Sequence, residues 1–141
     1  MRIPGYINYG YRPPAPFVAA LVFLREFNKR ARLPLLLDTG ASNTIILWGD
    51  VERLGIDVSG MKAGREFTGL GGQIGAKPMS GTISLTSEEG EVVEESVEVC
   101  IVTSAYPHPK LRLLPSIMGR DIINKYSLRY DFAVGKVYLE K

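Results

Sequence analysis

Asp38 is the residue with the clearest potential for chemistry, because it stands in the segment Leu-Leu-Leu-Asp-Thr-Gly-Ala-Ser-Asn-Thr at residues 35–44. The run of leucines predicts a buried strand, so the carboxylate that follows it would be held rigidly at the end of a sheet. Thr39 offers a hydroxyl, and Gly40 lets the chain turn while its amide approaches the carboxylate. This arrangement can present an acid at the floor of a cleft.

The tripeptide Asp-Thr-Gly is weak evidence by itself, because Asp and Gly are also favoured in ordinary turns that end a strand. Two later segments support a catalytic interpretation: a glycine-rich hairpin at residues 69–73, and Ser-Ile-Met-Gly-Arg-Asp-Ile-Ile at residues 116–123. In this order the three segments resemble the retropepsin-like aspartic proteases, the family of the retroviral proteases. The resemblance covers approximately residues 17–132.

The resemblance implies both a fold and an activity. The fold would be mostly β, a closed-barrel-like acid protease fold with two short helices and one lobe per chain. The activity would be that of an aspartic endopeptidase that hydrolyses an extended peptide or protein substrate and needs no cofactor. Members of the family are homodimers in which each subunit gives one catalytic Asp, here Asp38.

Roles for individual residues follow from the same resemblance. Thr39 would form a hydrogen bond across the two-fold axis of the dimer, and the backbone near Gly40 would contact the substrate. The substrate-binding residues would lie beside this loop and in a flap with a two-residue Gly-Gly turn: Ala41, Ser42, Leu70, Gly71, Gly72 and Gln73. Support for the catalytic loop would come from the segment that opens the following helix: Gly119, Arg120 and Asp121.

The chemistry of aspartic proteases independently requires a second carboxylate, because two acids must share one proton: one acts as a base on water and the other polarises the carbonyl group. The other aspartates of the chain are not in an Asp-Thr-Gly or Asp-Ser-Gly setting; they are Asp50, Asp57, Asp121 and Asp131. We therefore expect two identical subunits to meet on a two-fold axis with Asp38 facing Asp38.

Two features depart from the family pattern. Ser42 stands where the family often has an acid that pairs with the arginine matching Arg120, so Arg120 needs another acceptor: Asp121, Asp131 or backbone carbonyls. The chain also continues past the usual C-terminal helix into residues 128–141, and we expect this hairpin to provide the contacts on which dimer assembly rests. These departures leave open a second hypothesis, a retropepsin-like dimerisation or peptide-binding module without useful turnover.

The rest of the chain predicts short strands and little helix. A domain over residues 17–141 is expected to follow an extension over residues 1–16, whose four prolines favour a loose tail over a segment lying on a partner. Strands are predicted at 17–27, 33–37, 44–47, 82–86, 91–102 and 113–118, with hairpins at 65–76 and 128–139. Helices are predicted from Trp48 to a stop at Gly55, and over 121–126.

Composition excludes several classes of protein. Seventeen Lys and Arg against fifteen Asp and Glu leave a formal charge of +2, which does not fit a nucleic-acid surface, and no apolar run is long enough to cross a membrane. The single Cys100 and the single His108 predict neither a metal site nor a nucleophile, and the chain is expected in the cytoplasm. Six glutamates are expected to form a solvated acidic edge: Glu88, Glu89, Glu91, Glu94, Glu95 and Glu98.

Overall fold

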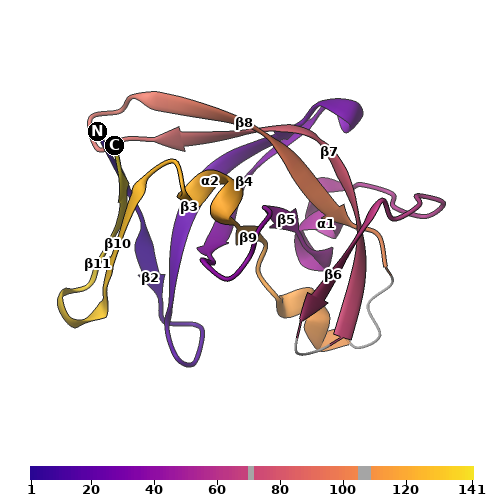
Figure 1. Cartoon of the computed structure of the whole chain (residues 1–141), viewed down its shortest axis with the longest axis horizontal. Coiled ribbons are helices and arrows are strands. Elements are labelled where there is room, and N and C mark those ends of the chain that lie inside the picture. Colours follow the sequence, from indigo (N-terminus) through magenta and orange to yellow (C-terminus); the bar gives the residue numbers. More distant parts are fainter. Residues whose placement is uncertain (70–71, 105–108) are drawn as a thin grey trace.

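Strands dominate the computed structural model of the chain, which describes residues 1–69, 72–104 and 109–141 (Figure 1). The described strands are β1 (Arg2–Pro4), β2 (Tyr6–Asn8), β3 (Ala15–Leu24), β4 (Lys29–Leu37), β5 (Ile45–Ile46), β6 (Arg65–Gly69), β7 (Gly72–Thr86), β8 (Val92–Val102), β9 (Ile117–Met118), β10 (Ser127–Asp131) and β11 (Lys136–Glu140). The described α-helices are α1 (Trp48–Leu54) and α2 (Arg120–Ile123), and three short 3-10 turns are η1 (Arg25–Phe27), η2 (Pro109–Leu113) and η3 (Phe132–Val134). The predicted mostly β fold with two short helices is confirmed.

Eight strands form one sheet in the order β2-β3-β4-β9-β5-β8-β7-β6, and an additional antiparallel pairing joins β3 to β7. This extra pairing closes a ring, because β3 then contacts both β4 and β7 (Figure 1). The other strands make a three-stranded sheet in the order β1-β11-β10, so the two ends of the chain lie beside each other.

The hydrophobic core fills the inside of this ring because side chains alternate along its strands. On β3, Val18, Ala20, Val22 and Leu24 are at most 1% exposed. On β4, the alternate residues are again buried: Leu33, Leu35 and Leu37. The leucine run therefore forms the predicted buried strand, and β4 ends where Asp38 begins.

The N-terminal segment is part of the folded structure rather than a loose tail. Strand β1 pairs with β11, and β2 pairs with β3. Ile3 is 1% exposed, and the rings of Tyr6 and Tyr11 stack on Phe17 with centroids 5.9 and 5.3 Å apart. The prolines keep the segment extended, but an extended chain with apolar side chains can join a sheet at its edge.

Several predicted boundaries match the structure. Helix α1 begins at Trp48 and ends before Gly55, whose φ of 69° is the left-handed conformation that glycine adopts at helix ends. The closing hairpin consists of β10 and β11. Residues 82–86 form a strand, but as the end of the longer β7.

Other predicted elements are shorter than expected. The predicted buried strand over residues 113–118 is wrong for its first half: only Ile117 and Met118 are in β9, while Leu113 and Leu114 are 75% and 45% exposed. Pro115 lacks an amide hydrogen and interrupts the ladder just before β9. The predicted helix over residues 121–126 is the single turn α2.

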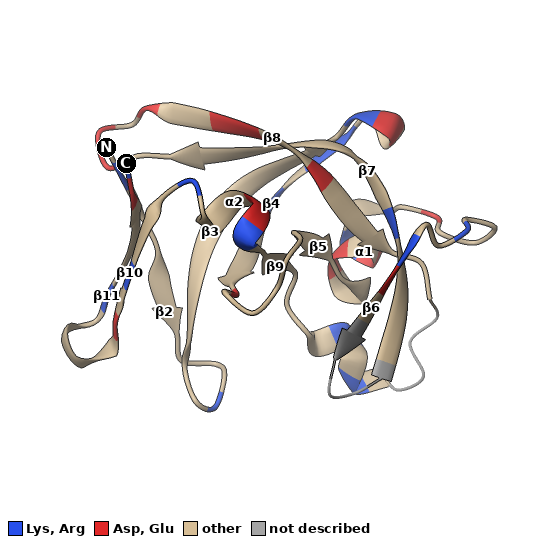
Figure 2. Cartoon of the chain, viewed as in Figure 1, with Lys and Arg blue, Asp and Glu red and all other residues tan. Residues whose placement is uncertain are grey.

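The acidic edge has one exception. Acidic residues lie along β8 and at the turn before it (Figure 2), but Glu95 is only 7% exposed. It lies on the inward face of β8, and its carboxylate accepts hydrogen bonds from Lys125 Nζ at 2.7 Å and from the Tyr126 hydroxyl at 2.6 Å. The prediction that Glu95 is solvated is therefore wrong.

Within the described residues, no helix has the length and apolar character that a membrane span requires.

Candidate active site

Asp38 begins immediately after β4, and its backbone is fixed by a neighbouring strand. Strands β4 and β9 are parallel, with Leu37 paired to Met118. The backbone amide of Asp38 donates to the carbonyl oxygen of Met118 at 3.1 Å, which extends this ladder by one residue. The position of the carboxylate therefore depends on β9, a strand that lies far away in the sequence.

The loop after Asp38 folds back on the carboxylate. Oδ1 of Asp38 accepts a hydrogen bond from the amide of Gly40 at 2.9 Å, and the Asp38 carbonyl oxygen accepts one from the amide of Ala41 at 3.1 Å. A Cβ atom at Gly40 would lie 3.1 Å from Oδ1, so glycine leaves room for this approach. Asp38 is half-buried, whereas Thr39 and Gly40 are exposed.

Arg120 holds this loop from the other side through two backbone carbonyl groups. Its amide donates to the carbonyl oxygen of Ala41 at 2.9 Å, and its guanidinium Nη1 donates to that of Thr39 at 2.7 Å. Sequence analysis left three possible acceptors for Arg120, and its guanidinium uses the third of these, a backbone carbonyl group. The carboxylate of Asp121 accepts hydrogen bonds from Thr44, and that of Asp131 pairs with Arg129 at 2.8 Å.

A buried hydrogen-bond network closes the end of the loop. Thr44, fully buried, donates from its amide to Oδ2 of Asp121 at 2.9 Å and from its hydroxyl to Oδ1 at 2.8 Å. The Thr44 hydroxyl also accepts a hydrogen bond from the amide of Gly119 at 3.2 Å. A Cβ atom at Gly119 would lie 2.5 Å from backbone atoms of Asn43, so the two segments touch through their backbones.

Thr44 is the residue of this network whose role sequence reasoning missed. The only signal was a hydroxyl placed directly before the buried pair Ile45 and Ile46. Ser42 is exposed and donates to the side-chain oxygen of Asn43 at 3.1 Å. Ala41 is half-buried.

The predicted flap can be described only in part. Strands β6 and β7 are antiparallel, and Gly69 is paired with Gly72. Gly72 therefore belongs to β7 rather than to the predicted Gly-Gly turn. Gln73 is exposed and paired with Thr68, whereas Leu70 and Gly71 lie outside the described residues, as does His108.

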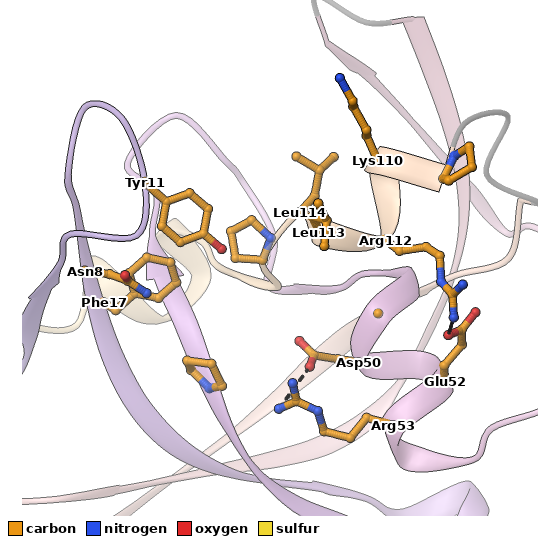
Figure 3. Close-up of a pocket in the computed structure, with 14 residues that line it drawn as sticks. Asn8, Tyr11, Phe17, Asp50, Glu52, Arg53, Lys110, Arg112, Leu113 and Leu114 are labelled. Carbon is orange, nitrogen blue, oxygen red and sulfur yellow. Dashed lines mark hydrogen bonds and ion pairs between the residues drawn. The ribbon is translucent and has the colours of Figure 1, made fainter.

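A groove of about 670 Å³ lies beside α1, and Asp38 is not among its lining residues (Figure 3). Pro34 of β4, the loop before β3, α1 and η2 contribute to its walls. Asp50 also lines it and is 8% exposed, with its carboxylate 3.6 Å from the guanidinium of Arg53.

The single cysteine, Cys100, is buried in β8. Cys100 is fully inaccessible, and burial raises the pKa of its thiol, although Arg65, 3.8 Å from the sulfur, partly opposes this. Within the described part of the chain, no group of three or more His, Cys, Asp or Glu side chains is placed to hold a metal ion.

The chain is similar to known proteins in sequence and in fold. A family model described as Aspartyl protease matches residues 26–122, a range that includes Asp38, Thr44 and the segment 119–121. The crystal structure of a retropepsin-like aspartic protease from Rickettsia conorii is similar over 99% of this chain and 88% of that chain, with a TM-score of 0.58 and 16% sequence identity. At this identity the likeness concerns the fold. No curated protein matches the chain in sequence.

Proposed function

This chain belongs to the aspartyl protease family, and from that premise we propose that it is an endopeptidase whose active site forms when two copies bring their Asp38 carboxylates together. Its fold is retropepsin-like, as the sequence predicted. The observation that carries the proposal is the half-buried Asp38 at the end of a core strand: its backbone amide bonds to the carbonyl oxygen of Met118, and its carboxylate accepts a hydrogen bond from the amide of Gly40.

In the proposed mechanism the two carboxylates share one proton, because like charges so close together cannot both be ionised. The ionised Asp38 takes a proton from a water molecule, whose oxygen forms a bond to the carbonyl carbon of the peptide. The protonated Asp38 of the other copy donates its proton to the carbonyl oxygen. When the tetrahedral intermediate collapses, the carbon–nitrogen bond breaks and the departing amine takes the proton that the first Asp38 received from water. A hydroxyl group of the intermediate returns its proton to the Asp38 of the other copy as the new carboxyl group forms, so the pair again holds one proton.

An exposed aromatic and aliphatic surface supports the homodimer. Tyr9, Tyr130, Phe132 and Val134 are 68%, 44%, 52% and 61% exposed, and the rings of Tyr9 and Phe132 lie 6.3 Å apart. Clusters of exposed apolar side chains are typical of protein interfaces. We therefore propose that the second copy docks against the hairpin β10–β11, as the sequence led us to expect.

The remaining site residues are assigned in the same proposal. The exposed Thr39 would bond to its counterpart across the two-fold axis, and Gly40 would contact the backbone of an extended peptide. Ala41, Ser42 and the flap would line the path of the peptide, the flap closing over it at residues 70–73. The cytoplasmic location remains a prediction from the cysteine content.

The test is cleavage of a mixed peptide library by the purified chain, compared with the variant Asp38→Asn. We expect the wild-type chain to cleave and the variant to lose activity, because the uncharged amide cannot act as the base. Asp57→Asn is the matched control, since Asp57 is exposed and its carboxylate accepts two local hydrogen bonds from Ser59. Cleavage that survives Asp38→Asn would contradict the proposal.

A tandem protein, in which a linker joins two copies of the chain, tests the shared pair. Asp38→Asn in one copy alone should abolish cleavage if each site needs both carboxylates, whereas independent sites would leave about half of the activity. A wild-type chain that sediments as a monomer with full activity would exclude the shared pair. A chain that binds peptides but cleaves none would favour the non-catalytic peptide-binding module.

A further inference from the structure

Asp50 is a buried carboxylate that the proposed mechanism does not use. It lies in the first turn of α1 and is 8% exposed. Its Oδ2 atom accepts a hydrogen bond of 2.6 Å from the hydroxyl of Ser116, and both side chains are buried. Short bonds between a hydroxyl and a carboxylate are stronger than bonds between neutral groups, and burial strengthens them further.

Ser116 connects this carboxylate to the strand that positions Asp38. Its hydroxyl also accepts a hydrogen bond from the amide of Leu47 at 3.0 Å, and its carbonyl oxygen accepts one from the amide of Leu36 at 2.9 Å. Two residues later in the chain, the carbonyl oxygen of Met118 accepts a hydrogen bond from the amide of Asp38. A short covalent and hydrogen-bonded path therefore runs from Asp50 through Ser116 and β9 to the catalytic loop.

The position of α1 makes this connection possible. Figure 3 shows Asp50 on α1 at the groove wall beside Arg53. A Cβ atom at Gly49 would overlap the carbonyl oxygen of Arg112. Helix α1 therefore packs closely, through its glycine, against the backbone of the segment that leads into Ser116. Removal of the Asp50 carboxylate would leave the Ser116 hydroxyl without its acceptor in a site where Ser116 is inaccessible to water.

We propose that Asp50 is a positioning residue for the proposed reaction: through Ser116 it holds β9, and thereby Asp38, in the geometry that catalysis requires. This inference rests on the proposed function. The second half of the path consists of backbone hydrogen bonds that every residue type except proline can donate. The specific part is the pair of side chains, Asp50 and Ser116.

Steady-state kinetics of four variants test the proposal. Asp50→Ala and Ser116→Ala each remove the bond, and we expect kcat to fall about tenfold with KM changed by less than about twofold, because substrate contacts remain while the reacting group is misplaced. Asp50→Asn keeps an acceptor and should restore kcat to within about threefold of wild type. The double variant should resemble either single variant, because both act through one bond.

Asp57→Ala is the matched control, since it removes an exposed acid from the segment just after α1 and should leave kcat unchanged. Variants that lose stability but keep the wild-type kcat would overturn the proposal, because Asp50 would then be merely structural. If Asp50→Ala fails to fold, Ser116→Ala and Asp50→Asn decide by the same criteria.

Amide hydrogen exchange separates a failure of this inference from a failure of the proposed function. If the wild-type chain cleaves nothing, the proposed function fails, but exchange at Leu36 and Asp38 can still be measured. Ser116→Ala should raise their exchange rates at least about tenfold and leave Tyr130 and Val137, paired in the other sheet, unchanged. Unchanged rates at Leu36 and Asp38 would overturn the inference even if the chain is an active protease.

Discussion

Thr44 gives two hydrogen bonds to one carboxylate, that of Asp121: one from its amide at 2.9 Å and one from its hydroxyl at 2.8 Å. The two residues are 77 positions apart in the sequence. Because Asp38 is bound to Met118 at the start of the loop and Thr44 to Asp121 at its end, the Asp38 loop is anchored at both ends to the segment around α2. The two fixed ends limit the conformations of the loop between them.

Substitution Thr44→Val should weaken this anchor while nearly preserving shape. Val removes the hydroxyl, so Asp121 loses one donor and the buried amide of Gly119 loses its acceptor. We expect a loss of about 2 kcal/mol in the free energy of unfolding, measured in urea, and a lower kcat for peptide cleavage. The matched control is Thr86→Val at an exposed position of β7, which should change neither quantity. Equal effects at the two positions would contradict the assigned role.

Substitution Gly119→Ala should be destabilising because the added Cβ atom would clash sterically, and not because the backbone conformation disfavours alanine. The φ of Gly119 is −92°, which any residue can adopt, but a Cβ atom would lie 2.5 Å from the carbonyl carbon and oxygen of Asn43. We expect a loss of about 3 kcal/mol in the free energy of unfolding, measured by denaturant titration.

Gly10→Ala is the control for this experiment. Its Cβ atom would meet only the side chain of Asn8, whose oxygen accepts an exposed hydrogen bond from the amide of Gly10. Because this side chain can shift at the loss of at most that one exposed bond, a change of less than about 1 kcal/mol is expected. If Gly119→Ala is as mild as this control, the close approach of the two backbones is not as tight as the structure indicates.

Much of the fold could be predicted because its signals are local. The leucine run predicts β4, the spacing of Trp48, Val51 and Leu54 predicts α1, and Gly55 marks its end. The Asp-Thr-Gly segment predicts a carboxylate at the end of a strand for the same reason.

The features that sequence analysis missed depend on partners far away in the chain. Strand β1 exists because β11 pairs with it, and a three-residue segment containing a proline carries no strand signal of its own. Thr44 becomes an anchor only because the fold places Asp121 beside it. Glu95 looked solvated because it lies among other glutamates, and nothing local indicates that Lys125 and Tyr126 cover it.

The buried Glu95 gives a prediction for pH. Burial alone would raise the pKa of Glu95, but hydrogen bonds from Lys125 and Tyr126 and the charges of Lys125 and Lys141 outweigh it, so the pKa lies below its ordinary 4.5. The ionised form is therefore favoured by folding. Its contribution to stability is fully present above pH 4.5 and is lost as the pH falls through the lowered pKa of the folded state.

Substitution Glu95→Gln should accordingly cost about 2 kcal/mol in the free energy of unfolding at pH 7, and the difference from wild type should shrink below pH 4.5. Unfolding in urea at several pH values measures the difference between the variant and the wild-type chain. The control is Glu94→Gln, which changes an exposed neighbour on the same strand and should cost almost nothing at any pH. A difference at Glu95 that grows as the pH falls would reverse the predicted sign.

Cys100 should be unreactive in the folded chain for two reasons. Its side chain is inaccessible, and burial raises the pKa of the thiol above its ordinary 9.0 in spite of the opposing charge of Arg65, so little thiolate is present at pH 8. We expect a thiol reagent at pH 8 to modify the native chain at least about a hundredfold more slowly than the chain unfolded in urea, because reaction must wait for an opening of β8. Since Cys100 is the only cysteine, the rate of labelling reports this opening directly. Rapid labelling of the native chain would mean that the end of β8 beside the Asp38 loop opens far more easily than its buried contacts imply.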